Sequence, residues 1–158
     1  MDRSEILEVV RNVYLFQDLT EEELEEVVTI ATEEVYSSNQ KIFDEGEEGD
    51  VFYVVVEGSV RISTEVPGVG EEALAVLKKG DYFGEMALIE SAPRSAAAIA
   101  NDDNTVLLAF KKAPFWSLME KCPSVAFKVL WVFVKTLSRR LRDTDEKLKA
   151  ILAMAKSF

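Results

Sequence analysis

The sequence contains no histidine, and Cys122 is its only cysteine. Zinc, haem and iron–sulfur sites are built from imidazole and thiolate ligands, so this chain alone cannot supply a ligand set for them. The lack of histidine also excludes Ser-His-Asp and Cys-His catalysis, and one cysteine cannot form an internal disulfide. We therefore expect no metal, no cofactor, no catalytic residue and no enzymatic activity.

Basic residues are also scarce. The 18 lysines and arginines are outnumbered by 29 aspartates and glutamates, which gives a formal net charge of −11. Such a surface repels phosphate polymers, so we expect no direct binding of nucleic acid. No segment reaches the roughly 18 apolar residues that span a bilayer, and the first residues do not resemble a signal peptide. We expect a cytoplasmic protein without a membrane partner.

Hydrophobic residues make up 48% of the 158 residues, enough for the core of one domain. Two helices are predicted near the N-terminus. The first covers residues 2–12, where apolar side chains recur at helical spacing. The second begins with a capping box formed by Thr20 and Glu23. Its predicted inner face comprises Leu24, Val27, Val28 and Ala31.

Short apolar runs separated by turn residues follow from Val35 onward. This alternation predicts antiparallel strands, and their regular spacing favours a β-roll or jelly-roll barrel. The fold class is therefore α+β, with N-terminal helices and a long C-terminal helix flanking the roll. The predicted strands are Lys41–Phe43, Val51–Val56, Ser59–Thr64, Ala73–Leu77, Ser95–Asn101 and Thr105–Phe110.

A long helix is predicted from Pro123 onward, because proline is favoured at a first helical position. We assign residues 1–122 to the β-roll with its N-terminal helices, and 123–158 to a helix of the same domain. Its apolar stripe alternates steps of three and four, which is typical of a coiled-coil seam and predicts a homodimer. The alternative is that the stripe covers only its own core. The seam comprises Phe127, Leu130, Val134, Leu137, Leu141, Thr144, Leu148 and Ile151.

The segment from Gly84 to Ala98 has features of a phosphate-binding loop. A strand ends in a glycine and a helical turn follows, so free backbone N–H groups can face an anion. Arg94 adds a planar guanidinium that can donate two parallel bonds to phosphate oxygens, and Ser95 adds a hydroxyl. The segment is therefore a candidate anion site.

Glu85 lies next to this site, where a carboxylate would repel a phosphate. A ribose hydroxyl is the natural donor to it, which indicates a nucleotide with a free 2′-hydroxyl. The alternative is an ordinary surface ion pair between Glu85 and Arg94. An acid–base pair of Glu85 and Glu90 is less favoured, since the nearby arginine accounts for them better.

The motifs from Phe83 to Leu88 and from Pro93 to Ala96 resemble the phosphate-binding cassette of the cyclic-nucleotide-binding family. That family includes catabolite activator proteins, protein kinase A regulatory subunits and cyclic-nucleotide-gated channels. The segments Ile42–Asp50 and Phe52–Val60 also resemble it. The glycine-to-arginine spacing is similar to that of the kinase type.

The resemblance implies roles for individual residues. Gly84 and Glu85 would bind the ribose 2′-hydroxyl, and Arg94 the cyclic phosphate. Ser95 and Ala96 would contact the phosphate, and Ile62 and Leu74 would form an apolar wall against the base. Two positions depart from the family pattern by small substitutions, Ala97 and Ala98. The whole set of ligand-binding candidates is Gly84, Glu85, Met86, Ala87, Arg94, Ser95, Ala96, Ile62, Leu74, Thr144 and Asp145.

The segment Arg139–Leu148 is similar to the dimer helix of catabolite activator proteins, where adjacent hydroxyl residues reach the base. Thr144 and Asp145 stand at those positions. A threonine can accept from the adenine amino group, which favours cyclic AMP, whereas an aspartate could accept from guanine, which would favour cyclic GMP. We expect a sensor that prefers cyclic AMP and repositions its final helix. Because no helix-turn-helix is present, we expect either a sensor that signals through an unidentified effector protein or the ligand-binding part of a larger regulator. The alternative is a dimerisation or scaffold module that has lost nucleotide binding.

Overall fold

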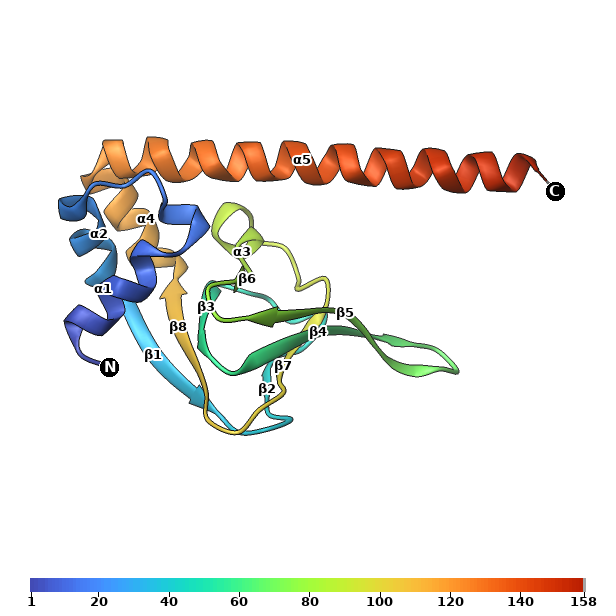
Figure 1. Ribbon diagram of the computed structural model, residues 1–158, viewed down its shortest axis with the longest axis horizontal. Coiled ribbons are helices and arrows are strands. Elements are labelled where there is room, and N and C mark those ends of the chain that lie inside the picture. The colour runs from blue at the N-terminus through green and yellow to red at the C-terminus, as the bar shows by residue number, and fades with distance from the viewer. Residues whose placement is uncertain (158) are drawn as a thin grey trace.

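The computed structural model describes residues 1–157 of the chain. Helical segments lie at both ends of the sequence and a β-roll lies between them (Figure 1). The helical segments are α1 (Arg3–Arg11), η1 (Tyr14–Phe16), α2 (Glu21–Val28), α3 (Met86–Ile89), α4 (Lys112–Lys121) and α5 (Pro123–Lys156). The strands are β1 (Ala31–Tyr36), β2 (Lys41–Phe43), β3 (Val51–Glu57), β4 (Ser59–Val66), β5 (Gly70–Lys78), β6 (Tyr82–Phe83), β7 (Ala97–Ala100) and β8 (Thr105–Lys111).

The strands form two four-stranded sheets, ordered β1-β8-β3-β6 and β2-β7-β4-β5. Every strand pair is antiparallel. Because β3 and β4 are joined by a tight turn but lie in different sheets, the chain rolls from one sheet into the other. The predicted α+β fold with an antiparallel roll is confirmed.

The N-terminal helices begin as the sequence predicts but end sooner. The capping box of Thr20 and Glu23 is present in α2, and Asp2 and Glu5 form a second one at the start of α1. Ala31, predicted on the inner face of α2, is instead the first residue of β1. It pairs with Phe110 of β8, so pairing with the sheet overrides the helical spacing of its side chain.

Two apolar clusters hold the molecule together. One lies between the helices and the first sheet, where the rings of Phe52 and Phe110 stack with centroids 4.6 Å apart and Phe16 packs against both. The other lies between the two sheets and is lined by residues such as Val55 and Leu107. The first cluster holds the helices, and the second holds the roll around the candidate site.

Only the first half of α5 contributes buried residues, although Arg140 of the second half reaches Glu85. The buried residues are Val125, Val129, Val132, Phe133 and Thr136. From Ser138 to Ser157 every residue is exposed, and this half extends away from the other helices (Figure 1).

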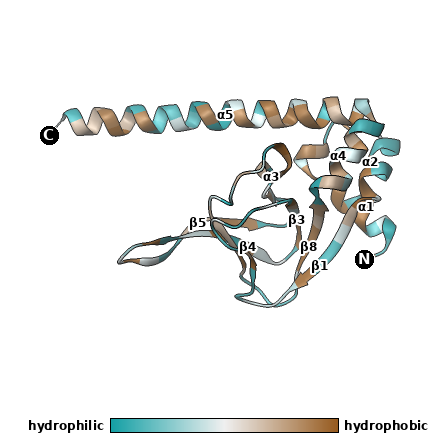
Figure 2. Cartoon of the chain, turned by 180° about the vertical axis from the view of Figure 1, so that it is seen from behind, coloured by the Kyte–Doolittle hydropathy of each residue, from teal (hydrophilic) through white to brown (hydrophobic). Residues whose placement is uncertain are grey.

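The residues of the predicted seam lie on a different stripe of α5 from those that enter the core. Phe127, Val134, Leu141 and Ile151 are all more than half exposed. Hydrophobic residues accordingly show along the whole length of the helix (Figure 2). The stripe therefore does not cover the core of its own domain, contrary to the alternative drawn from the sequence.

Candidate functional site

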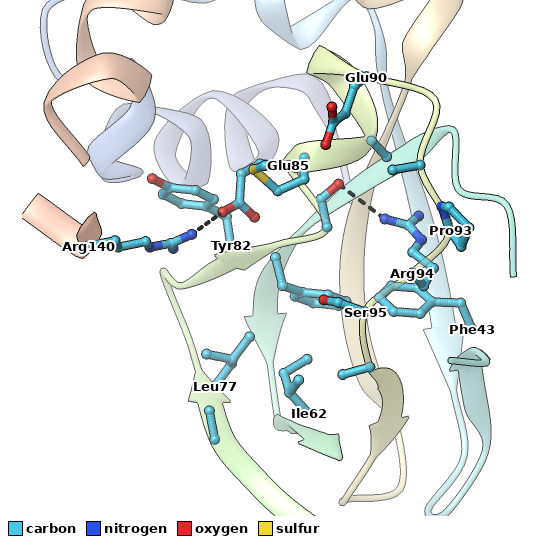
Figure 3. A pocket seen from close by; sticks show the side chains of 17 residues that line it. Phe43, Ile62, Leu77, Tyr82, Glu85, Glu90, Pro93, Arg94, Ser95 and Arg140 are labelled. Atoms are coloured by element: carbon cyan, nitrogen blue, oxygen red, sulfur yellow. Dashed lines mark hydrogen bonds and ion pairs between the residues drawn. The ribbon is translucent and has the colours of Figure 1, made fainter. Parts of the chain in front are cut away.

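A cavity of about 510 Å³ lies between the second sheet, the segment after β6 and one side chain from α5 (Figure 3). Most of the cassette predicted from the sequence lines it. The lining residues are Phe43, Ile62, Ala75, Leu77, Tyr82, Phe83, Gly84, Glu85, Met86, Ala87, Glu90, Ala92, Pro93, Arg94, Ser95, Ala96 and Arg140. Sequence positions far apart thus converge on one concave surface.

Gly84 makes the sharp change of direction between β6 and α3. Its φ of +77° is in the left-handed region that L side chains rarely adopt. A Cβ here would lie 2.7 Å from Nη1 of Arg94 and 3.2 Å from the carbonyl oxygen of Val51. Only glycine fits at this position, because both the backbone conformation and the close approach of the arginine require it.

Arg94 is the best-anchored cation of the site, with 9% of its surface exposed. Its Nη1 donates to the carbonyl of Gly84 at 3.1 Å, and its Nη2 donates to the carbonyl of Val51. The Nε–H is buried and has no partner. Burial lowers the pKa of the guanidinium, although nearby tyrosine and carboxylate groups oppose that shift. A buried charged donor without a partner is costly unless a ligand supplies an acceptor.

The backbone around Arg94 is held by the turn between β2 and β3. The N–H of Arg94 donates to the carbonyl of Glu47 at 2.8 Å, and the N–H of Gly46 donates to the carbonyl of Arg94 at 2.8 Å. The turn of residues 46–50, part of the segment Ile42–Asp50 singled out from the sequence, therefore fixes the position of the arginine.

Glu85 carries the second charge of the site. Its side chain is only 8% exposed, and its Oε1 accepts from Nη1 of Arg140 at 2.7 Å (Figure 3). The carboxylate is therefore paired with α5 and not with Arg94, so the surface ion pair considered from the sequence is wrong. Burial raises the pKa of the neighbouring Tyr82 hydroxyl, and the Glu85 carboxylate raises it further.

The apolar wall of the pocket differs in one position from the prediction. Ile62 lines the cavity as predicted, together with Ala75 and Leu77. Leu74 does not, and it is 60% exposed. Ile62 pairs with Ala75 and Ser63 with Ala73, so Leu74 is the extra residue of a β-bulge. Because Ala75 and Leu77 face the cavity, the two-residue alternation of β5 points Leu74 to the opposite face.

The structure brings the remaining cassette candidates into the pocket but leaves the two helix candidates outside. Met86, Ala87, Ser95 and Ala96 line the cavity, while Thr144 and Asp145 do not. The hydroxyl of Thr144 donates to the carbonyl of Arg140, one turn earlier, at 2.9 Å. The base-contacting roles of Thr144 and Asp145 remain predictions.

Nine lining residues were not among the predicted ligand-binding residues, and they include Phe43, Tyr82 and Arg140. Arg140 carried a usable signal, since it precedes Thr144 by one helical turn and so shares its face. Tyr82 directly precedes the cassette. Phe43 lies in β2, and nothing in the local sequence connects it with Arg94.

Within residues 1–157 there is neither a metal-binding cluster nor a membrane-spanning helix. In this part of the chain, no group of three or more histidine, cysteine or carboxylate side chains is placed to hold a metal ion. None of the helices described there combines the length and the hydrophobicity that crossing a bilayer requires. The geometry thus consists of a small cavity with a buried arginine, a buried glutamate and an apolar wall.

Comparison with known proteins identifies the class. The family model of the cyclic nucleotide-binding domain matches residues 33–122, more than half of the chain. The chain therefore belongs to the cyclic nucleotide-binding domain family, a family of regulatory sensor domains.

Individual relatives support the same assignment. The chain is 35% identical over 134 residues to the cyclic AMP receptor protein of Thermus thermophilus, which covers 85% of this chain and 60% of that protein. It is 31% identical over 147 residues to mouse (Mus musculus) cGMP-dependent protein kinase 2, which covers 92% of this chain and 19% of the kinase. The structure of the Thermus thermophilus catabolite activator protein superposes with a TM-score of 0.76 at 33% identity, covering 87% of this chain and 62% of that one. The chain thus spans less than two thirds of these relatives.

Proposed function

We propose that this chain binds a cyclic nucleotide, with cyclic AMP preferred over cyclic GMP, and acts as a regulatory sensor. The observation that carries the proposal is the buried Nε–H of Arg94, which has no acceptor within the described part of the chain. A cyclic phosphate in the 510 Å³ cavity would supply that acceptor and the counter-charge together.

Glu85 is the proposed contact for the ribose. Glu85 uses Oε1 to bind Arg140, which leaves Oε2 free to accept from a ribose hydroxyl. Phosphate and ribose would then hold the nucleotide from two sides, and the base would lie toward Ile62, Ala75 and Leu77.

Repositioning of α5 is the proposed response. Arg140 is the one residue of this helix that lines the pocket, so a ligand that binds Glu85 acts directly on the ion pair that joins pocket and helix. The helix lies exposed from Ser138 onward, and little packing opposes its movement. A ligand with different affinities for two helix positions would shift their populations.

The preference for cyclic AMP rests on Thr144. It lies outside the pocket in this structure, one turn beyond Arg140, so a modest shift of α5 or a partner's α5 would bring a hydroxyl to the base. The relatives include proteins named for each nucleotide, cyclic AMP in the Thermus thermophilus receptor and cyclic GMP in the mouse kinase.

We also propose that α5 forms a homodimer along its exposed seam and that the output passes to an unidentified effector protein.

The direct test is calorimetric titration of both nucleotides into the wild-type chain and into the Arg94→Ala variant. Loss of the charge-assisted bond to the phosphate should weaken binding by about 100-fold or more, with wild type preferring cyclic AMP. Arg142→Ala, an exposed arginine outside the pocket, is the matched control and should bind as wild type does. Wild-type protein that binds neither nucleotide would instead favour a scaffold module, and a preference for cyclic GMP would contradict the base assignment.

A further inference from the structure

We infer that Phe43 is a positioning residue for Arg94, holding the guanidinium in the orientation that a phosphate needs. The inference rests on the proposed function, since it assumes that Arg94 receives the phosphate. The Cζ atom of Arg94 lies 4.0 Å from the centroid of the Phe43 ring. A cation at this distance over an aromatic face is attracted by the negative charge of the π system.

The Phe43 ring is itself fixed by other aromatic rings. Its centroid is 6.0 Å from that of Phe83 and 6.2 Å from that of Tyr53. Those two rings stack on each other at 5.2 Å. Phe43 is therefore the end member of a packed aromatic group that reaches from the inter-sheet core to the pocket, where it meets the arginine (Figure 3).

The backbone restrains the same guanidinium from other directions. A Cβ on Gly49 would lie 2.2 Å from Nε and 2.4 Å from Cζ of Arg94, so the turn passes directly against the group. The carbonyls of Gly84 and Val51 engage Nη1 and Nη2. Phe43 is the side chain that adds to these backbone contacts, and the Nε–H remains unpaired.

Preorganisation is the functional consequence. Arginine has a long side chain with many rotamers, and immobilising it during binding would weaken affinity. A ring that already holds the guanidinium removes much of that cost before the ligand arrives. An aliphatic residue of similar volume would fill the space without attracting the guanidinium electrostatically. The aromatic ring of Phe43, and not only its volume, is therefore what positions Arg94.

The test is a double-mutant cycle between Phe43 and Arg94, read by nucleotide affinity. We expect Phe43→Leu to weaken binding by about 3- to 30-fold and Phe43→Tyr to bind nearly as wild type does. In the Arg94→Lys background, Phe43→Leu should have little further effect, because the group that it positions is gone. Leu77→Ala, on the apolar wall, is the control and should weaken binding equally in both backgrounds.

A second measurement needs no nucleotide. In the free protein, the Arg94 Nε–H resonance should be shifted by the Phe43 ring current and slow to exchange, and it should lose both properties in Phe43→Leu but not in Phe43→Tyr. Phe43→Met replaces the leucine variant if that variant does not fold. An unchanged resonance, or equal effects of Phe43→Leu in both Arg94 backgrounds, overturns the inference. Failure of wild type to bind either nucleotide, with the resonance still responding to Phe43→Leu, overturns the proposed function alone.

Discussion

At the scale of single residues, Glu23 joins two helices through one carboxylate. It completes the capping box of α2 by accepting from the N–H of Thr20 at 2.9 Å. It also accepts from the ammonium of Lys128 and from the hydroxyl of Ser124 on α5. Burial alone would raise the pKa of this carboxyl, but these hydrogen bonds outweigh burial and lower the pKa to about 2.

This lowered pKa predicts a specific loss of stability in acid. The folded pKa of Glu23 is about 2 and the ordinary value is 4.5, so its contribution is complete above about pH 4.5 and is lost as the pH falls toward 2. Denaturant unfolding should show wild type more stable than Glu23→Gln at pH 7, with the difference shrinking between pH 4.5 and 3. Glu22→Gln, in the same first turn of α2, is the control. A difference that stays constant over this range would show that the ionised carboxylate is not responsible.

At the scale of elements, the pocket and α5 are joined by the ion pair of Glu85 and Arg140. The carboxylate is almost buried, whereas the arginine is 55% exposed. Solvent screens the exposed partner, so the pair is a modest restraint on the helix that a ligand can compete with.

Removing that pair should uncouple the helix from the ligand. In a Cys122→Ser background, with spin labels on Lys147 of α5 and Glu72 of β5, saturating cyclic AMP should shift the measured distance distribution. In Arg140→Gln the shift should be clearly smaller, even at concentrations that saturate the variant. Arg139→Gln, next to it and outside the pocket, should respond as wild type does. Equal shifts in all three proteins would assign the coupling to some other contact.

The elements also show where sequence reasoning succeeds and where it stops. The strands with regular apolar runs, such as β2, β3 and β8, were predicted nearly to their ends. β1 was missed because none of its residues is buried and its sequence lacks a run of apolar residues. β6 has two residues, too few to show any period.

The candidate site, like the fold, could be predicted only where a local sequence pattern carries the information. The cassette was predictable because its residues are consecutive and their types carry the chemistry. Leu74 was assigned to the apolar wall from the family resemblance alone, whereas in the structure Ala75 and Leu77 occupy the inward positions of β5 and Leu74 lies on the other face. Arg140 could be inferred from its helical spacing to Thr144, whereas Phe43 joins the site through the packing of its ring against Arg94, which the local sequence does not show.

At the scale of the whole molecule, the seam of α5 leaves large apolar side chains exposed along the helix. Leu141 and Leu148 are 63% and 52% exposed, well beyond the region where α5 packs on the core. Side chains of this kind repeating at heptad spacing are typical of a helix that pairs with another helix.

The dimer predicted from this seam can be broken by one charge. Sedimentation should give a dimer for wild type and a monomer for Leu141→Glu, because two facing carboxylates would be buried at the seam. Ala153→Glu, an equal charge added away from the seam, should remain dimeric. The circular dichroism of the β-roll should be unchanged in both, since neither residue contacts it. A wild-type monomer at tens of micromolar, or a dimeric Leu141→Glu, would contradict the prediction.

The exposed half of α5 is long enough that a small tilt of the helix would move its end by a large distance. The last described helical residue, Lys156, lies about 24 Å beyond Arg140 at a rise of about 1.5 Å per residue. A tilt of only about 10° at the pocket would therefore move the far end by about 4 Å, roughly the width of a side chain. If α5 is repositioned as proposed, a small change at Glu85 would become a much larger displacement at the end of the helix, where the proposed effector protein could detect it.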